Sequence, residues 1–134
     1  MAGYSSKNLI DKLGVKPGAR VIVMHPPAGY LELLPEMSER ADVAARLGGR
    51  LDFIQYFATS FEQLNVVLPN LALHLEPNGM LWICWAKRTS RLHTGLTEGI
   101  VRELGLKAGL VDVKVAALTN DWSGLKFVYR LTDR

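Results

Sequence analysis

The stretch LDFIQYFATSFEQLNVVLPNLALHLEPNGMLWICWA, residues 51–86, decides the fold. It contains an apolar run at 51–58, a longer segment with apolar residues at helical spacing, and a second apolar run at 80–86. Both runs read as buried strands, and Thr59-Ser60 between them is a good helix cap. We predict a turn at Glu76-Pro77-Asn78-Gly79, before the second strand. Strand, helix and strand in this order predict parallel strands joined by a right-handed crossover.

Upstream of this unit, Arg20–Met24 predicts another buried strand, and residues 6–13 predict a short amphipathic helix. The part from 29 to 47 is ambiguous. Ser38 fits the cap of a helix through Leu47, whereas alternation at 43–47 permits a short edge strand. Only three residues separate Leu47 from the next strand, and parallel neighbours need a crossover of about a dozen residues or more. We therefore favour a mostly helical crossover and keep the edge strand as the alternative.

Downstream, residues 96–106 predict a helix capped by Thr94. Alternating residues at 111–117 and 125–131 then predict a hairpin with NDWSG, residues 120–124, at its tip. The predicted fold class is α/β: a small, Rossmann-like, mainly parallel sheet flanked by helices, with a C-terminal antiparallel hairpin.

Composition supports one globular domain over residues 1–134, since 49% of the 134 residues are apolar and 22% are charged. No apolar run approaches the roughly 18 residues of a membrane span, and the N-terminus lacks a secretory pattern, so we expect a cytoplasmic protein away from membranes. The lone Cys84 lies in a predicted strand and is expected to be buried and reduced. A net charge of +3 is small for a nucleic-acid binder, and we do not expect that role.

The order of elements resembles a known fold. Gly14-Val15-Lys16-Pro17-Gly18 before the first strand, the turn at 76–79 before a later one, and the closing hairpin together resemble a Rossmann-like methyltransferase. A helix, strand and helix usual in such enzymes are missing between the second and fourth strands, which implies a smaller sheet.

At finer grain the chain is similar to a family of short bacterial proteins that carry a domain of unknown function. The segments that carry this similarity are Ala2–Ser5, Lys12–Gly18, Leu96–Glu98, Gly109–Val115 and Trp122–Lys126. The resemblance implies a fold and no activity.

The loop after the first strand argues against a standard cofactor site. It reads His25-Pro26-Pro27-Ala28-Gly29-Tyr30. Dinucleotide and methyl-donor sites use closely spaced glycines so that backbone N–H groups approach the ligand, whereas two prolines remove two donors here. We therefore expect no bound cofactor, neither S-adenosylmethionine nor NAD.

Several polar residues are expected at one edge of the sheet, where α/β proteins bind ligands. His25 would follow the first strand, Thr59 and Ser60 the next, and Lys87 the one after. Together they could bind an anion, although a helix cap and a solvated loop are the competing structural explanations. Trp122 and Ser123 in the hairpin tip complete the ligand-binding candidates. No spacing of His and Cys suggests a metal site.

We interpret the chain as a non-catalytic, methyltransferase-like domain that binds a small molecule or a protein partner, and a homodimer is compatible with this interpretation. We expect no catalytic residues. One alternative is a small methyltransferase-type transferase with an atypical cofactor loop, and another is a weak nucleic-acid binder.

Overall fold

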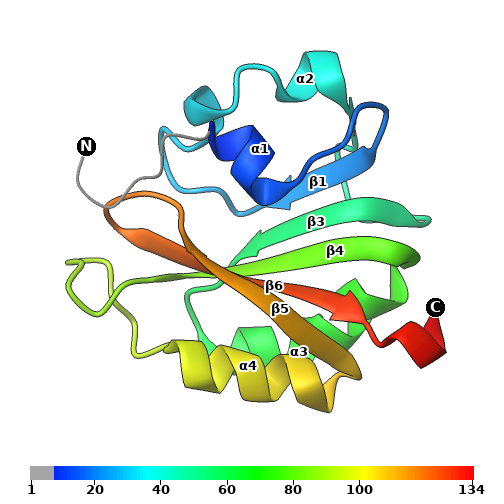
Figure 1. The fold of residues 1–134 in the computed structure, drawn as a ribbon. Coiled ribbons are helices and arrows are strands. Elements are labelled where there is room, and N and C mark those ends of the chain that lie inside the picture. Colours follow the sequence, from blue (N-terminus) through cyan, green and yellow to red (C-terminus); the bar gives the residue numbers. More distant parts are fainter. Residues whose placement is uncertain (1–7) are drawn as a thin grey trace.

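The computed structural model describes residues 8–134, which form one six-stranded sheet with helices on both faces (Figure 1). The predictions for Ala2–Ser5 and for Ser6 lie outside the described residues. None of the helices in residues 8–134 combines the length and the apolar character that crossing a membrane requires.

The sheet has the order β2-β1-β3-β4-β6-β5. The first four of these strands are mutually parallel, and β6 is antiparallel to both β4 and β5. The predicted α/β class, mainly parallel with a C-terminal antiparallel hairpin, is confirmed. The strands are β1 (Arg20–Met24), β2 (Asp42–Val43), β3 (Leu51–Phe57), β4 (Leu75–Ala86), β5 (Leu110–Ala117) and β6 (Trp122–Tyr129). The helices are α1 (Leu9–Leu13), α2 (Met37–Arg40), α3 (Phe61–Leu73) and α4 (Glu98–Lys107), with short 3-10 turns at Leu31–Leu33 and Leu131–Asp133.

Two apolar cores lie on the two faces of the sheet. Helices α1 and α2 cover one face, and α3 and α4 cover the other (Figure 1). Trp82 belongs to the core under α1 and Trp85 to the core under α3 and α4, as their spacing on one strand requires. The Trp82 indole also donates a hydrogen bond to the carbonyl oxygen of Leu13, 2.9 Å away, which fixes α1 on the sheet.

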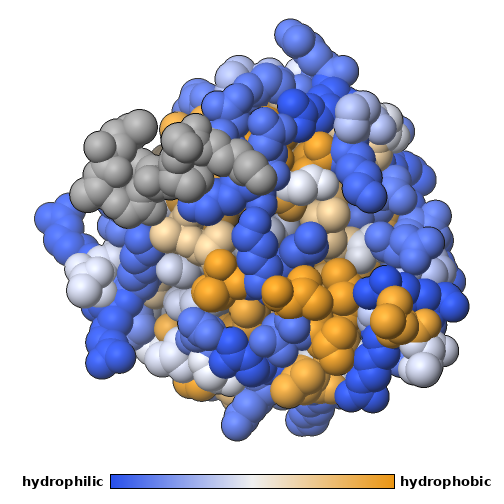
Figure 2. Space-filling view, viewed as in Figure 1, coloured by the Kyte–Doolittle hydropathy of each residue, from blue (hydrophilic) through white to orange (hydrophobic). Residues whose placement is uncertain are grey.

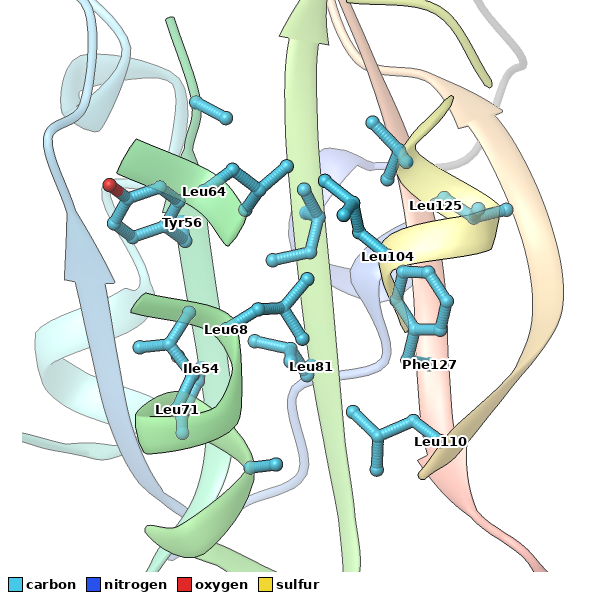
Figure 3. Packing of buried hydrophobic residues seen from close by; sticks show 14 of the residues in the cluster. Ile54, Tyr56, Leu64, Leu68, Leu71, Leu81, Leu104, Leu110, Leu125 and Phe127 are labelled. Carbon is cyan, nitrogen blue, oxygen red and sulfur yellow. The ribbon is translucent and has the colours of Figure 1, made fainter. Parts of the chain in front are cut away.

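The face under α3 and α4 is packed by side chains from every central strand (Figure 3). Leu64, Leu68 and Leu71 point from α3 onto the sheet at helical spacing, as predicted. Helix α4 begins at Glu98, and the Thr97 hydroxyl accepts the N–H of Ile100, so the cap is Thr97 rather than the predicted Thr94.

The ambiguous stretch from 29 to 47 contains less helix than predicted. Residues 37–40 form α2, so Ser38 lies inside a helix instead of capping one, and Asp42–Val43 form an edge strand. The crossover rule does not exclude this strand, because β1 lies between β2 and β3. The connection from β2 to β3 has only one strand, β1, to pass. The strand β2 is short and pairs only with Arg20 and Val21 at the start of β1.

The predicted turn at 76–79 is wrong, because these residues belong to β4. The pairing register runs from Leu51 opposite Leu75 to Phe53 opposite Met80, so β4 carries extra residues between the two pairs. Such a stretch is a bulge. Proline, asparagine and glycine suit a bulge and a turn alike, which explains the error.

The hairpin is confirmed with a shifted tip. Trp122 is the first residue of β6 and pairs with Ala86, so the connection is 118–121, and Leu131 lies beyond the strand. A bulge between Asp112 and Lys114 interrupts β5, and the side chains of Val113 and Val115 are 55% and 50% exposed. Figure 2 shows apolar side chains gathered on this side of the molecule, in the region where β5 runs in Figure 1.

Candidate functional site

The predicted site residues lie at one edge of the sheet. The parallel strands β1, β3 and β4 end there, and β6 begins there. Pairing places Met24 beside Tyr56, Phe57 beside Cys84, and Ala86 beside Trp122. The expectation of a shared edge is therefore confirmed, but the candidates are spread over four neighbouring strands.

His25 lies beside an open groove on the α3 side of this edge. Its backbone φ is 56°, a conformation that few residues other than glycine adopt, and its side chain is exposed. The imidazole meets the Tyr56 ring edge-on, with 5.4 Å between the ring centroids. This backbone conformation holds an imidazole at the position where open α/β sheets bind ligands.

The groove has a volume of about 500 Å³. We call it the His25 groove, and its lining residues are Met24, His25, Tyr56, Glu62, Gln63, Val66 and Val67. Methionine, valine and tyrosine side chains form its walls, while Glu62 and Gln63 from the first turn of α3 add polar groups. Burial raises the pKa of the Tyr56 hydroxyl above its ordinary value, so this group is a neutral hydrogen-bonding partner at physiological pH.

The loop after β1 folds over the opposite face of the sheet. Tyr30 is buried there, its hydroxyl accepts a hydrogen bond from the side-chain amide of Gln55 at 2.8 Å, and its ring packs edge-on against Phe57. The Tyr30 N–H is used internally, on the carbonyl oxygen of Pro27. Because Pro26 and Pro27 lack an N–H, this loop has few backbone donors left for an anionic ligand.

Ser60 has a structural role. Its hydroxyl oxygen accepts the N–H of Gln63 at 3.2 Å, which caps α3, and its own proton is donated to the carboxylate of Glu62. Both hydrogen-bonding functions of the hydroxyl are therefore used within α3. Thr59 is exposed next to this cap and does not line the groove.

Lys87, Trp122 and Ser123 lie away from the groove, toward the hairpin. The Lys87 N–H donates to the carbonyl oxygen of Asp121, and Ser123 pairs with Trp85. Trp122 is only 7% exposed and packs edge-on against Phe57, with ring centroids 5.2 Å apart. This packing within the domain accounts for Trp122 better than ligand binding does.

Other residues of the groove are not recognisable from the sequence. Val66 gives a weak sequence signal for the groove, because it is an apolar residue beside the inward stripe of α3. In the structure it lines the groove and is 78% exposed. Cys84 is fully buried, as predicted, and burial raises the pKa of its thiol to about 12, so it carries no reactive thiolate. Among residues 8–134, no group of three or more His, Cys, Asp or Glu side chains could hold a metal ion.

Solved structures of methyltransferases are similar to this chain over most of its length. A SAM-dependent methyltransferase from Aquifex aeolicus superposes with a TM-score of 0.66 at 17% identity, over 89% of this chain and 86% of that one. Magnesium protoporphyrin IX methyltransferase from Synechocystis PCC 6803, solved with bound SAM, gives 0.60 at 14% identity, over 91% and 74%. A TehB-like SAM-dependent methyltransferase from Corynebacterium glutamicum gives 0.59 at 15% identity, over 96% and 91%.

No protein-family model matches the sequence, and no curated protein matches it. At these identities, structural likeness shows the fold and leaves the chemistry open. The chain has a methyltransferase-like fold.

Proposed function

We propose that this chain is a non-catalytic, methyltransferase-like domain that binds a small molecule in the His25 groove. The observation that carries the proposal is the contrast between the two sides of the same sheet edge. On one side Tyr30 is fastened to Gln55 and the loop after β1 is closed over the sheet. On the other side the His25 groove is open.

The chemistry of the groove favours a flat, largely apolar ligand with a hydrogen-bonding edge. Its volume of about 500 Å³ lies within the range of small-molecule sites. The Tyr56 and His25 rings offer aromatic contacts, and Glu62 and Gln63 offer a carboxylate acceptor and an amide. A planar heteroaromatic compound with an N–H donor matches this set of groups.

A methyltransferase-type transferase is the second candidate. Its support is the likeness to SAM-dependent methyltransferases and the strained backbone of His25 beside the groove. The closed loop after β1 speaks against it, because the prolines and the buried Tyr30 leave few donors for a methyl-donor carboxylate. Binding of S-adenosylmethionine separates the two candidates.

Cytoplasmic residence and kinship with short bacterial proteins of unknown function belong to the same proposal. Their support is the lone reduced Cys84 and the sequence similarity described above. We also propose a homodimer. The His25 groove does not depend on it, because residues of a single chain line the groove. Analytical ultracentrifugation tests the oligomeric state directly.

The experiment is a thermal-shift screen against nucleotides, S-adenosylmethionine, acidic metabolites and planar heteroaromatic fragments. A ligand that binds only the native state raises its melting temperature, by an amount that corresponds to about 2.7 kcal/mol at one hundred times its Kd. We expect a heteroaromatic compound to act on the wild type and to lose its effect in the exposed groove variants Val66→Glu and His25→Ala.

The matched control is Val113→Glu, which places the same charge on an exposed valine of β5. It should bind like the wild type. An equal rise in melting temperature in all variants would place the binding site outside the His25 groove. No rise with any compound of the screen would contradict small-molecule binding and favour a protein partner.

A further inference from the structure

Four lysines gather on the side of the molecule that carries α1. Lys12 comes from α1, Lys16 from the loop after it, Lys114 from β5 and Lys126 from β6. The Lys12 ammonium donates to the carbonyl oxygen of Ala117 at 2.6 Å, and the Lys114 ammonium donates to the carbonyl oxygen of Lys12 at 3.3 Å. Segments about one hundred residues apart in the sequence therefore bring positive charges together.

These charges lack acidic partners among residues 8–134. The ion pairs described there use Arg20, Arg40 and Arg102, and none uses a lysine. Residues 1–7 contain neither Asp nor Glu. Lys16 and Lys126 donate no side-chain hydrogen bond within residues 8–134, although Lys126 is half-buried. A half-buried ammonium group beside other positive charges, such as that of Lys126, is stabilised by a nearby anion.

The pKa values of the two half-buried lysines, Lys126 and Lys12, agree with this crowding. Burial lowers the pKa of Lys126, and the charges of Lys114 and Lys16 lower it further. Burial, then Lys114 and Lys87, lower the pKa of Lys12. Like charges at short range destabilise one another, and a bound anion would relieve that repulsion.

A cavity of about 300 Å³ lies beside this cluster, at the edge of the sheet opposite to the His25 groove. Its lining includes Gly14, Lys16, Gly18, Asp52 and Asn78. The Lys126 ammonium lies close to the cavity wall at Gly14, because a β-carbon on Gly14 would stand 4.0 Å from it. Because Gly14 has no side chain, it leaves this approach open.

We infer that this cavity binds a small phosphorylated molecule that also carries hydroxyl groups. Its phosphate lies against Lys16 and Lys126, and its hydroxyl groups bond to Asp52 and Asn78. Lysine is a common phosphate ligand. The Asp52 carboxylate lines the cavity and accepts the backbone N–H of Arg20. A carboxylate only accepts hydrogen bonds, so the body of the ligand must supply the donors. A sugar phosphate has both kinds of group and suits the cavity's size.

The test is an NMR titration of the ¹⁵N-labelled protein with ribose 5-phosphate as the probe. We expect saturable shifts of the backbone amides of Gly14, Gly18 and Asn78, and no saturable shift with ribose. Lys16→Met and Lys126→Met keep the side-chain stem and remove the charge. Each should weaken the affinity at least about tenfold, because a hydrogen bond between an ammonium and a phosphate is stronger than one between neutral groups.

The matched control is Lys107→Met, which removes an exposed lysine from α4 on the other face, and it should leave the affinity within about twofold of wild type. Melting temperatures of all variants show whether each is folded. Equal affinity in every folded variant, or no saturable shift in the wild type, would overturn the inference. Binding of single-stranded RNA or of an acidic peptide without binding of ribose 5-phosphate would overturn it too, and would make the lysines a polyanion surface.

Discussion

The side-chain amide of Gln55 donates a hydrogen bond to the hydroxyl of Tyr30 across 2.8 Å in the interior of the protein. Gln55 has no exposed surface, and its amide oxygen has no partner within residues 8–134. This bond joins the loop after β1 to the centre of the sheet. It thereby closes the position at which a Rossmann-like protein would hold a cofactor.

We expect Tyr30→Phe to lower the free energy of unfolding by about 1–3 kcal/mol, because the Gln55 amide then keeps only the Cys84 sulfur, 3.5 Å away, as an acceptor in the core. Urea denaturation measures the loss. The double variant Tyr30→Phe/Gln55→Met removes both polar groups and should recover most of it. A single variant as stable as the wild type would show that the bond does not hold the loop.

The burial of Cys84 predicts a dependence of stability on pH. Its thiol pKa is raised from 9.0 to about 12 in the folded state, so the unfolded chain loses this proton at lower pH. The stabilisation is full below about pH 9 and is lost as the pH rises toward 12. Cys84→Ala should show a shallower decline over this window in urea denaturation series, and parallel curves for the two proteins would contradict the placement of the thiol.

Trp122→Ala should destabilise the fold by about 3–5 kcal/mol, as truncation of a buried aromatic side chain does, because the indole packs against Phe57. Thermal and chemical denaturation measure the effect, and the mass in solution should stay constant. Leu131→Ala, at a position that is 79% exposed, is the control and should be close to neutral. A stable Trp122→Ala protein with an altered oligomeric mass would instead place the indole in an interface.

Two glycines of α4 should respond to alanine in opposite directions. A β-carbon on Gly105 would overlap the Phe127 ring, so Gly105→Ala should destabilise by about 1–3 kcal/mol or more. A β-carbon on Gly99 meets no atom closer than 4.0 Å, and Gly99→Ala should stabilise by about 0.5–1 kcal/mol. If both variants changed stability alike in urea denaturation, α4 would not pack on β6 as described.

The sequence predicts the elements whose signals are local. The strands that begin at Arg20 and Leu51 are continuous apolar runs, and α3 follows a serine cap with an apolar stripe. β2 is only two residues long and exists because it pairs with Arg20 and Val21. A pairing of this kind leaves no pattern in so short a segment.

The candidate site was harder to predict for the same reason. His25 is correctly placed at the edge of the sheet because the end of β1 is visible in the sequence. The His25 groove depends on how α3 stands against Tyr56, which is a tertiary relationship. The burial of Tyr30 likewise depends on Gln55, a residue 25 positions away.

Isothermal titration calorimetry of the purified protein with S-adenosylmethionine, and with NAD as a second ligand, tests directly whether the loop after β1 excludes a cofactor. We expect no measurable binding of either, because the loop from His25 to Tyr30 has two prolines and its tyrosine is hydrogen-bonded to Gln55. A micromolar Kd for S-adenosylmethionine would show that the loop after β1 admits a methyl donor, and would make the transferase the leading function.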